Sequence, residues 1–282
     1  AGSSMCQSAK YSSFVYFVYF WYNREPKGVL KDAGGSAVGI NHGMNVCQGL
    51  NPGDCYWGLS DLGWVAGISS LFMDPNQGAK AVFFEGKPII PDVGVVWRTI
   101  EKHKVNTLFL APTGIRILKK LDSEGKQIAK YDTSSLKLYN LAGERTDSDT
   151  ILWIAKHLPN TYVNIYMANE SLIPITSNFL DIEEFKTVRP SLPGSSGRNL
   201  PGGDVRIIDE ITNEELPPNK FGKICTKLPL PPSSIVTLWG NDQGFYDKYL
   251  ADTPGFYNSG DAGFMNEKGY IPAGNYVISV YW

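Results

Sequence analysis

One short segment of the chain combines a tight turn with a single carboxylate. Residues 257–263 read YNSGDAG, so Asp261 directly follows a Ser-Gly pair. A turn of this kind can hold a carboxylate outward, where its oxygens can accept hydrogen bonds from both hydroxyls of a ribose. The alternative is an Asp-Gly hairpin turn that binds no ligand. The motif makes Asp261 a candidate nucleotide-binding residue and leaves both interpretations open.

Two further acids follow runs that are expected to form buried strands. Glu144 comes after residues 136–141, and Glu170 comes after residues 162–166. Acids just beyond the carboxyl ends of parallel strands lie where ligands bind in open α/β sheets. Glu170 could hold Mg²⁺ through a carboxylate oxygen while the metal holds a phosphate. The alternative is that both acids are solvated turn residues or helix caps.

Other catalytic arrangements are not legible in the sequence, because no Ser-His-Asp or Cys-His pattern is present. We expect the three isolated histidines to be structural or surface groups: His42, His103 and His157. The cysteines form no CxxC pair, which favours a reduced intracellular protein over a disulfide scaffold. They are Cys6, Cys47, Cys55 and Cys225.

The elements that must position these acids alternate between short apolar runs and longer amphipathic ones. We expect strands at residues 81–84, 107–110, 136–141 and 162–166, and helices at 92–103, 113–121 and 147–157. Asp147 supplies N-cap chemistry to the last of these helices. The alternation predicts βαβ units around a mostly parallel sheet, so the fold class is α/β.

The character of the sequence changes after about residue 184, where prolines and glycines become dense and the apolar runs shorten to 205–209 and 222–227. We therefore expect an α/β subdomain over residues 1–184 and a small β-rich subdomain over residues 185–282.

Composition limits the partners. The 282 residues are 43% hydrophobic and carry a formal net charge of -2, so a packed core is expected and no basic field favours nucleic acid or an anionic membrane. The longest apolar run, residues 14–22, suits a buried strand and is too short to span a membrane. The chain begins at Ala1 without a methionine or a signal peptide, and we expect it to be a fragment.

The order of the motifs resembles the adenylate-forming enzymes, in the acetyl- and propionyl-CoA synthetase branch. The resemblance covers nearly the whole chain, and the propionate type is closest at residues 142–145 and 227–232. The matching segments are PKG at 26–28, DLGWV at 61–65, EGKP at 85–88, APTGIR at 111–116, AGER at 142–145, YMANE at 166–170 and YNSGDAG at 257–263.

The resemblance implies a fold, a reaction and a site. The chain would be part of the large domain of an enzyme that joins a carboxylate to ATP with Mg²⁺, expels pyrophosphate and passes the acyl group to CoA. Glu170 would be the metal-binding and catalytic residue, and Asp261 would bind the ribose. Gly143 and Glu144 would line the adenine side. The other nucleotide-binding positions correspond to Lys27, Asn164 and Asn169.

The acyl pocket would be formed by Trp64, Ala66, Ala142 and Met167. The last three are smaller or more flexible than the valine, threonine and tryptophan typical of acetate enzymes. One extra methylene is worth only about 1–3 kcal/mol in such a pocket, so we expect a modest preference for propionate over acetate.

The chain departs from the family at the loop before Pro26. In the family this loop is built of Ser, Thr and Gly, whose small size lets backbone N–H groups cradle the β- and γ-phosphates. Here residues 19–24 read YFWYNR, with Trp21 and Arg24 where glycines are expected. We therefore expect the phosphate loop to be lost.

Other departures agree. Asn164 replaces an aspartate that faces adenine, and Asn169 replaces a phosphate-binding threonine. The family's C-terminal domain, with its catalytic lysine, has no counterpart in the 282 residues. Three hypotheses follow: a segment of a longer active enzyme, a non-catalytic relative that binds nucleotide or a partner, and an inactive fragment. The propionate type also suggests the mitochondrial matrix.

Overall fold

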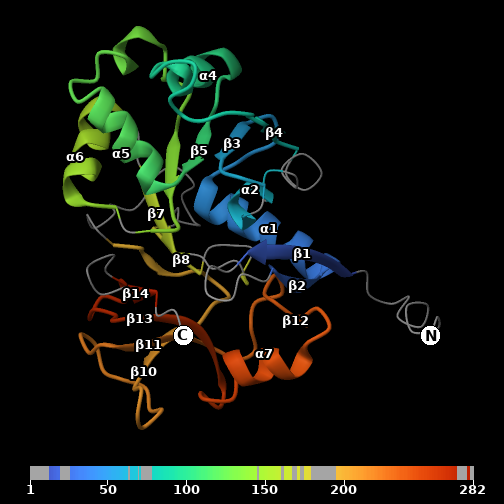
Figure 1. The fold of residues 1–282 in the computed structure, drawn as a ribbon. Coiled ribbons are helices and arrows are strands. Elements are labelled where there is room, and N and C mark those ends of the chain that lie inside the picture. Colours follow the sequence, from blue (N-terminus) through green and yellow to red (C-terminus); the bar gives the residue numbers. More distant parts are fainter. Residues whose placement is uncertain are drawn as a thin grey trace, which may run out of the picture.

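The largest element of the computed structural model is a seven-stranded sheet with the order β4-β3-β5-β6-β7-β8-β9 (Figure 1). The structure describes residues 13–19, 26–62, 64–68, 70, 78–144, 146–159, 162–166, 170–171, 175–178, 195–271 and 278–279. Strands β4 to β7 of this order run parallel, and β8 and β9 continue the sheet antiparallel. The strands are β3 (Cys55–Leu59), β4 (Lys80–Ala81), β5 (Thr107–Leu110), β6 (Leu138–Leu141), β7 (Tyr162–Tyr166), β8 (Thr176–Ser177) and β9 (Arg198–Asn199). The predicted α/β fold is confirmed.

Helices cover both faces of the parallel strands. Leu108 and Leu110 of β5 belong to a core that also contains residues of α4 (Val95–His103), α5 (Pro112–Leu121) and α6 (Ser148–His157). Thr107 faces the other way, because its hydroxyl donates to the backbone oxygen of Gln48 at 3.1 Å. Gln48 ends α1 (Ala33–Gln48), so α1 lies on the opposite face of the sheet from α5 and α6 (Figure 1).

Helix α1 is not among the elements that the sequence predicts. It begins at Asp32, whose carboxylate accepts a hydrogen bond from the Gly35 amide, and it ends at Gly49 in a left-handed conformation with φ 55°. A Cβ at Gly39 would lie 2.3 Å from the Cβ of Ser233. This glycine therefore lets α1 approach the segment before β12, although glycine weakens the helical pattern in the sequence.

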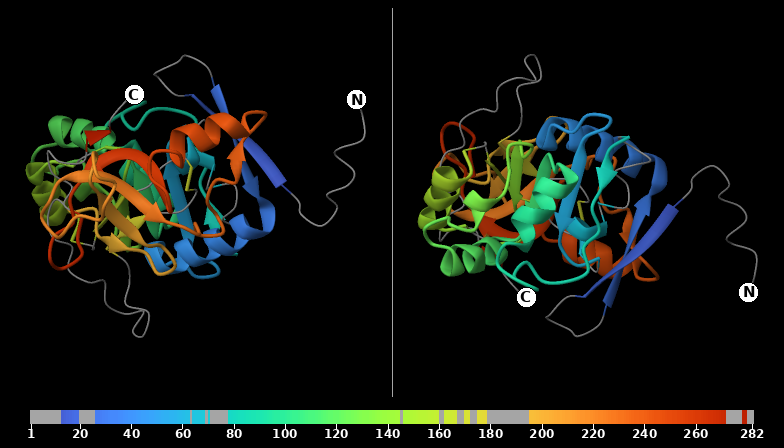
Figure 2. Two further views of the ribbon diagram at one scale, coloured as in Figure 1. Left: turned by 90° about the horizontal axis from the view of Figure 1, so that it is seen from below. Right: turned by 90° about the horizontal axis from the view of Figure 1, so that it is seen from above.

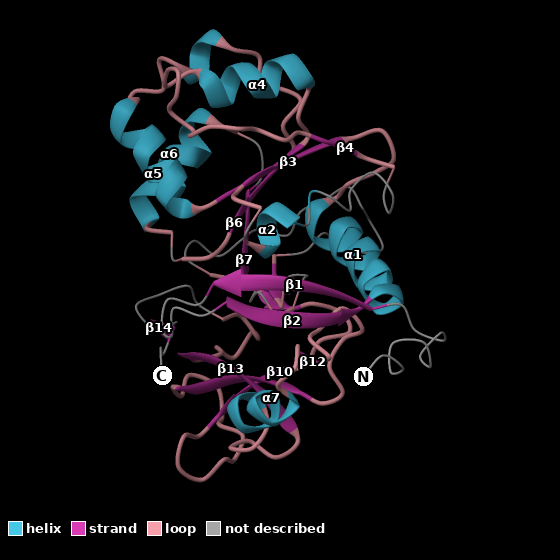
Figure 3. Ribbon diagram, turned by 45° about the vertical axis from the view of Figure 1, so that its right-hand side comes forward, coloured by secondary structure: helices cyan, strands magenta, loops and turns pink. Residues whose placement is uncertain are grey.

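Two antiparallel sheets complete the described fold. Figures 1 and 3 place β1 and β2 between the seven-stranded sheet and the four-stranded sheet. Helix α7 (Asp242–Tyr249) packs beside β12 and β13, with Tyr249 and Tyr257 in one buried cluster with Val29. The three-stranded sheet has the order β1 (Ser13–Tyr19), β2 (Pro26–Asp32), β12 (Thr237–Leu238), and the four-stranded sheet has the order β10 (Val205–Ile208), β11 (Gly222–Lys227), β13 (Phe256–Gly263), β14 (Ile278–Ser279). The short elements are α2 (Val65–Ile68) and a 3-10 turn at Ile128–Lys130.

The predicted elements match the structure in part. The strands expected at 107–110, 162–166 and 222–227 agree with β5, β7 and β11, whereas β3, α1 and α7 were not predicted. The expected strand at 81–84 overlaps β4 by a single residue. The division at residue 184 stays a prediction, because residues 179–194 lie outside the described part; β9, which follows, belongs to the seven-stranded sheet.

The apolar run near the start of the chain contains β1, the edge strand of its sheet within the described part of the chain. Both views of Figure 2 place β1 at the periphery of the molecule. Its composition and its edge position are those of a strand that can pair with another chain. None of the described helices has the length and apolar character needed to cross a bilayer.

The Asp147 cap gives a test of the local structure. Its Oδ1 accepts the Thr150 amide at 2.9 Å, as the sequence predicted, and its Oδ2 accepts Nε of Arg116 at 2.9 Å. We expect Asp147→Ala to lower the free energy of unfolding by about 1–2 kcal/mol, because the first turn of α6 loses its cap. Asp147→Asn is the control, since it keeps the cap and loses the charge. Equal losses in both variants, measured by urea unfolding, would assign the effect to the Arg116 ion pair instead.

Candidate functional site

The carboxyl ends of the parallel strands gather several of the predicted site residues. Trp64 follows β3 and directly precedes α2, which contains Ala66, while Ala142 follows β6. The parallel pairing of β3, β5 and β6 brings these ends to one edge of the sheet. Ala142 is buried, and Trp64 is 40% exposed. The role of these residues as an acyl pocket stays a prediction, and Met167 lies outside the described residues.

Glu144 is held against the start of α5. Its Oε1 accepts both the amide and the hydroxyl of Thr113, and its Oε2 accepts Nη1 of Arg116 at 3.1 Å. Burial raises the pKa of Glu144, but these hydrogen bonds outweigh it and hold the pKa below its usual value. The side chain therefore acts as an ionised clamp on α5, which agrees with the helix-cap alternative.

The backbone at Gly143, next to Glu144, has free space beside it. It has a φ of 95°, and a Cβ there would meet no atom of the described residues within 4 Å. A flat ligand could approach the backbone at this position because no side chain stands in the way. That Gly143 and Glu144 line the adenine side stays a prediction.

Glu170 is buried, and hydrogen bonds hold both its carboxylate and its backbone oxygen. Its carboxylate Oε1 accepts the hydroxyl of Tyr249 at 2.8 Å. Its backbone oxygen accepts the amide of Ile235 at 2.8 Å and Nζ of Lys31. The residue is only 6% exposed, so the alternative of a solvated turn residue is wrong for Glu170.

Lys31 is a buried cation that the sequence analysis missed. It is 0% exposed, and its Nζ also donates to the backbone oxygen of Ser233 at 2.9 Å. Burial lowers the pKa of Lys31 from 10.5 to about 7, although the charge of Glu170 acts in the opposite direction. The alternation of side chains along a strand could have predicted this burial. Lys31 lies two residues after Val29 in β2, so both side chains are on the same face, and Val29 is a core residue.

Asp261 lies in a bulge within β13, and not in the tight turn that the sequence predicted. Asn258 pairs with Cys225 and Ala262 pairs with Lys223. Three residues of β13, 259–261, therefore lie opposite a single residue of β11, Ile224. The hydroxyl of Ser259 donates to the Ile224 oxygen at 2.7 Å and accepts the Asp261 amide at 3.2 Å. The hairpin alternative is therefore wrong, because these residues continue a strand. Bulges of this kind re-aim side chains next to binding sites.

The remaining predicted positions are described less fully. Lys27 lies in β2 opposite Val18, and Asn164 lies in β7 opposite Leu141, but their side chains are outside the described part of the chain. Asn169 and residues 20–25 of the altered loop are outside it as well. Strands β1 and β2 pair antiparallel, with Tyr19 opposite Pro26.

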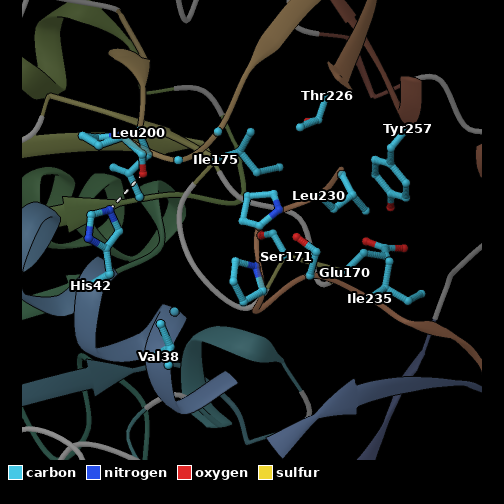
Figure 4. A pocket seen from close by; sticks show the side chains of 17 residues that line it. Val38, His42, Glu170, Ser171, Ile175, Leu200, Thr226, Leu230, Ile235 and Tyr257 are labelled. Carbon is cyan, nitrogen blue, oxygen red and sulfur yellow. Dashed lines mark hydrogen bonds between the residues drawn. The ribbon is translucent and has the colours of Figure 1, made fainter. Parts of the chain in front are cut away.

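A cavity of about 370 Å³ lies beside Glu170 (Figure 4). Its lining is mainly apolar and includes Val38, Leu200 and Leu230, with His42 at the α1 side. His42 Nε2 lies 2.9 Å from the backbone oxygen of Pro201. Glu170 is the single predicted site residue in this lining, so within the described chain the cavity is separate from the sheet edge at Trp64 and Ala142 and from Asp261.

At Glu170 the described residues offer a metal ion a single carboxylate. No group of three or more metal-ligating side chains converges among the described residues. Oε1 of Glu170 accepts the hydroxyl of Tyr249, and Oε2 is the oxygen that could serve as a ligand. Mg²⁺ is commonly bound in this way, through one or two carboxylates together with substrate phosphates and water.

The fold is that of an α/β protein with an open, mostly parallel sheet, a class in which ligands bind beyond the carboxyl ends of the strands. Comparison with known families makes this specific, because the model of the AMP-binding enzymes matches residues 25–230. The chain belongs to the AMP-binding enzyme family, and the resemblance found in the sequence is confirmed.

Curated relatives agree. The chain is 38% identical over 249 residues to an uncharacterised protein of Pseudomonas aeruginosa, which covers 88% of this chain and 39% of that protein. It is 37% identical over 256 residues to the mitochondrial acyl-CoA synthetase short-chain family member 3 of Bos taurus, covering 90% and 36%. It is 36% identical over 248 residues to the propionate–CoA ligase of Salmonella typhimurium, covering 87% and 38%. The chain therefore spans less than two fifths of these relatives.

The buried Lys31 predicts a pH dependence of stability. Between the folded pKa of about 7 and the usual value of 10.5, the unfolded chain binds the proton and the folded chain does not. Stability should therefore rise with pH above 7, by up to about 1.4 kcal/mol per pH unit. Burial raises the pKa values of Cys47 and Cys225 to about 12, which opposes the rise once unfolded thiols ionise near about pH 8.5.

The measurement is urea unfolding at several pH values from 7 to about 8, below the range in which thiols interfere. Lys31→Met removes the titrating group and should flatten the slope, even though it also lowers stability. A slope that persists in Lys31→Met would show that another group is responsible.

Proposed function

We propose that this chain carries the nucleotide and carboxylate site of a short-chain acyl-CoA synthetase. The protein that contains it would join ATP, CoA and a carboxylate such as propionate or acetate, and would release AMP and pyrophosphate. The observation that carries the proposal is the family match over residues 25–230, which includes Glu170 and the strand ends beside it. Relatives named as short-chain acyl-CoA synthetases and as a propionate–CoA ligase support it.

In this proposal the residues have separate tasks. Asp261, held by the bulge in β13, accepts hydrogen bonds from the ribose hydroxyls. Gly143 leaves the backbone open to the adenine ring. Oε2 of Glu170 holds Mg²⁺, which when bound neutralises phosphate charge. The burial of Glu170 keeps bulk water from its carboxylate, and electrostatic interactions are stronger where water is excluded.

The acyl group would be small. Trp64 lies at the sheet edge and the buried Ala142 leaves room beside it, with Ala66 and Met167 as the other proposed wall positions. Discrimination of one methylene by such a pocket is limited to about 1–3 kcal/mol, so propionate and acetate would both be accepted.

A second candidate function is favoured by the loop at residues 19–24, namely nucleotide binding without turnover. Trp21 and Arg24 replace glycines in a segment whose backbone N–H groups would otherwise hold the β- and γ-phosphates. The loss of one preorganised donor can cost roughly 10²–10³ in rate. In this reading the 282-residue chain alone binds the AMP half of ATP and does not form the adenylate.

The location follows from the same relatives. Several are named as mitochondrial, in Bos taurus and in Dictyostelium discoideum, and we propose the mitochondrial matrix for this protein.

Thermal melting with nucleotides tests the proposed site. AMP at 100 times its dissociation constant should stabilise the chain by about 2.7 kcal/mol. Asp261→Asn should abolish the shift, because the amide cannot accept hydrogen bonds from both ribose hydroxyls through two oxygens. Asp252→Asn, at an exposed position, is the matched control and should keep it. The absence of any shift with AMP in the unaltered chain would reject the proposed function.

The altered loop makes a separate prediction. At the same concentration of Mg²⁺, ATP should stabilise the chain no more than AMP does, because the outer phosphates find no cradle. Replacing Trp21 and Arg24 together by glycine should raise the affinity for ATP over AMP at least about tenfold, corresponding to about 1.4 kcal/mol. The two affinities are measured by calorimetry. A chain that already binds ATP much more tightly than AMP would contradict the loss of the loop.

A further inference from the structure

We propose that Tyr249 is a positioning residue for Glu170 and that it ties the Glu170 carboxylate to β13, the strand that carries Asp261. This inference rests on the proposed function, in which Glu170 holds the metal. It adds a residue from α7, an element that none of the sequence motifs includes.

The first argument is the hydrogen bond to the carboxylate. The Tyr249 hydroxyl donates to Oε1 of Glu170 at 2.8 Å, and Tyr249 is only 2% exposed. A hydrogen bond to an ionised acceptor in a buried place is stronger and more directional than one between neutral groups. With Oε1 occupied, the side chain has one defined orientation, and Oε2 is the oxygen left for a metal.

The second argument is the stacking behind that hydrogen bond. The ring of Tyr249 stacks on the ring of Tyr257, with centroids 5.2 Å apart and an interplanar angle of 11°. Tyr257 lies in β13, four residues before Asp261. Figure 4 shows the Glu170 carboxylate pointing toward Tyr257. The ring pair therefore connects the proposed metal ligand with the strand that holds the proposed ribose ligand.

The third argument is that the main chain of Glu170 is fixed independently. Its backbone oxygen is held by Lys31 from β2 and by the amide of Ile235. Tyr249 thus does not have to hold the backbone in place, and its hydroxyl acts on the carboxylate. Residues that orient a metal ligand in this way typically change metal affinity by 10–100-fold when they are mutated.

The experiment uses the 282-residue chain and two probes, AMP and Mn²⁺. Mn²⁺ prefers carboxylate and water ligands, as Mg²⁺ does, and its free form is read by electron paramagnetic resonance. AMP affinity is measured in EDTA by calorimetry, and Mn²⁺ affinity is measured on the chain saturated with AMP. Tyr249→Phe keeps the stack and removes the hydroxyl, so we expect Mn²⁺ affinity to fall about 10–100-fold while AMP affinity in EDTA is unchanged.

Matched variants separate positioning from a structural effect. Tyr246→Phe removes a hydroxyl from the same helix at a side chain that is 54% exposed, and both affinities should stay the same. In a Glu170→Gln background, Tyr249→Phe should cause no further loss, because its effect passes through the Glu170 carboxylate. If Tyr249→Phe does not fold, Tyr257→Leu removes the ring that supports Tyr249 and should lower Mn²⁺ affinity while AMP affinity in EDTA is unchanged.

The outcomes are distinct. Equal losses of AMP and Mn²⁺ affinity in Tyr249→Phe would mean that Tyr249 is merely structural, and an unchanged Mn²⁺ affinity would overturn the proposal as well. Binding of AMP without any Mn²⁺ in the unaltered chain would overturn the role of Glu170 and Tyr249 and leave the nucleotide site standing. No binding of AMP would reject the proposed function, and this inference with it.

Discussion

The buried side chain of Lys31 holds together the segments on which the rest of the site depends. It reaches from β2 to the backbone oxygens of Glu170 and Ser233, which are 139 and 202 residues further along the chain. These contacts join the three-stranded sheet to the end of β7 and to the segment before β12. The burial that lowers the pKa of Lys31 to about 7 is the energetic cost of this arrangement. A lysine at this place is tolerated because two carbonyl groups accept its hydrogen bonds.

Around this anchor the site is assembled from elements of different sheets. The parallel strands bring Ala142 and Gly143 to one edge, and the four-stranded sheet carries Asp261 in its bulge. The Glu170 carboxylate is bonded to Tyr249, which stacks on Tyr257 of β13, and the Glu170 backbone oxygen is held by Lys31. Strand β13 is paired on both sides, with β11 and with β14.

The fold and the phosphate chemistry of this family depend on different residues. The core between the parallel sheet and its helices is built of large apolar side chains such as Trp57, Trp97 and Leu118. The proposed phosphate loop is the connection between β1 and β2, whose residues 20–25 lie outside the described part of the chain. Under our proposal, Trp21 and Arg24 in place of glycines therefore act on phosphate binding and not on the apolar side chains that build the fold. The family match therefore shows the ancestry of the fold, and turnover is a separate question that the proposed experiments address.

The sequence by itself determined the elements whose signal is local. Apolar runs placed β5, β7 and β11, and Asp147 marked the start of α6, because periodicity and capping involve only neighbouring residues. Helix α1 was not predicted, because its Gly39 is there to allow close contact with Ser233, and a contact with a distant residue leaves no local sequence pattern. Only the tertiary structure decided that the Asp261 motif is a bulge, since a bulge is defined by its register with another strand. The same holds for the Glu170–Tyr249 bond, because burial and partners across 79 residues arise only when distant segments pack together.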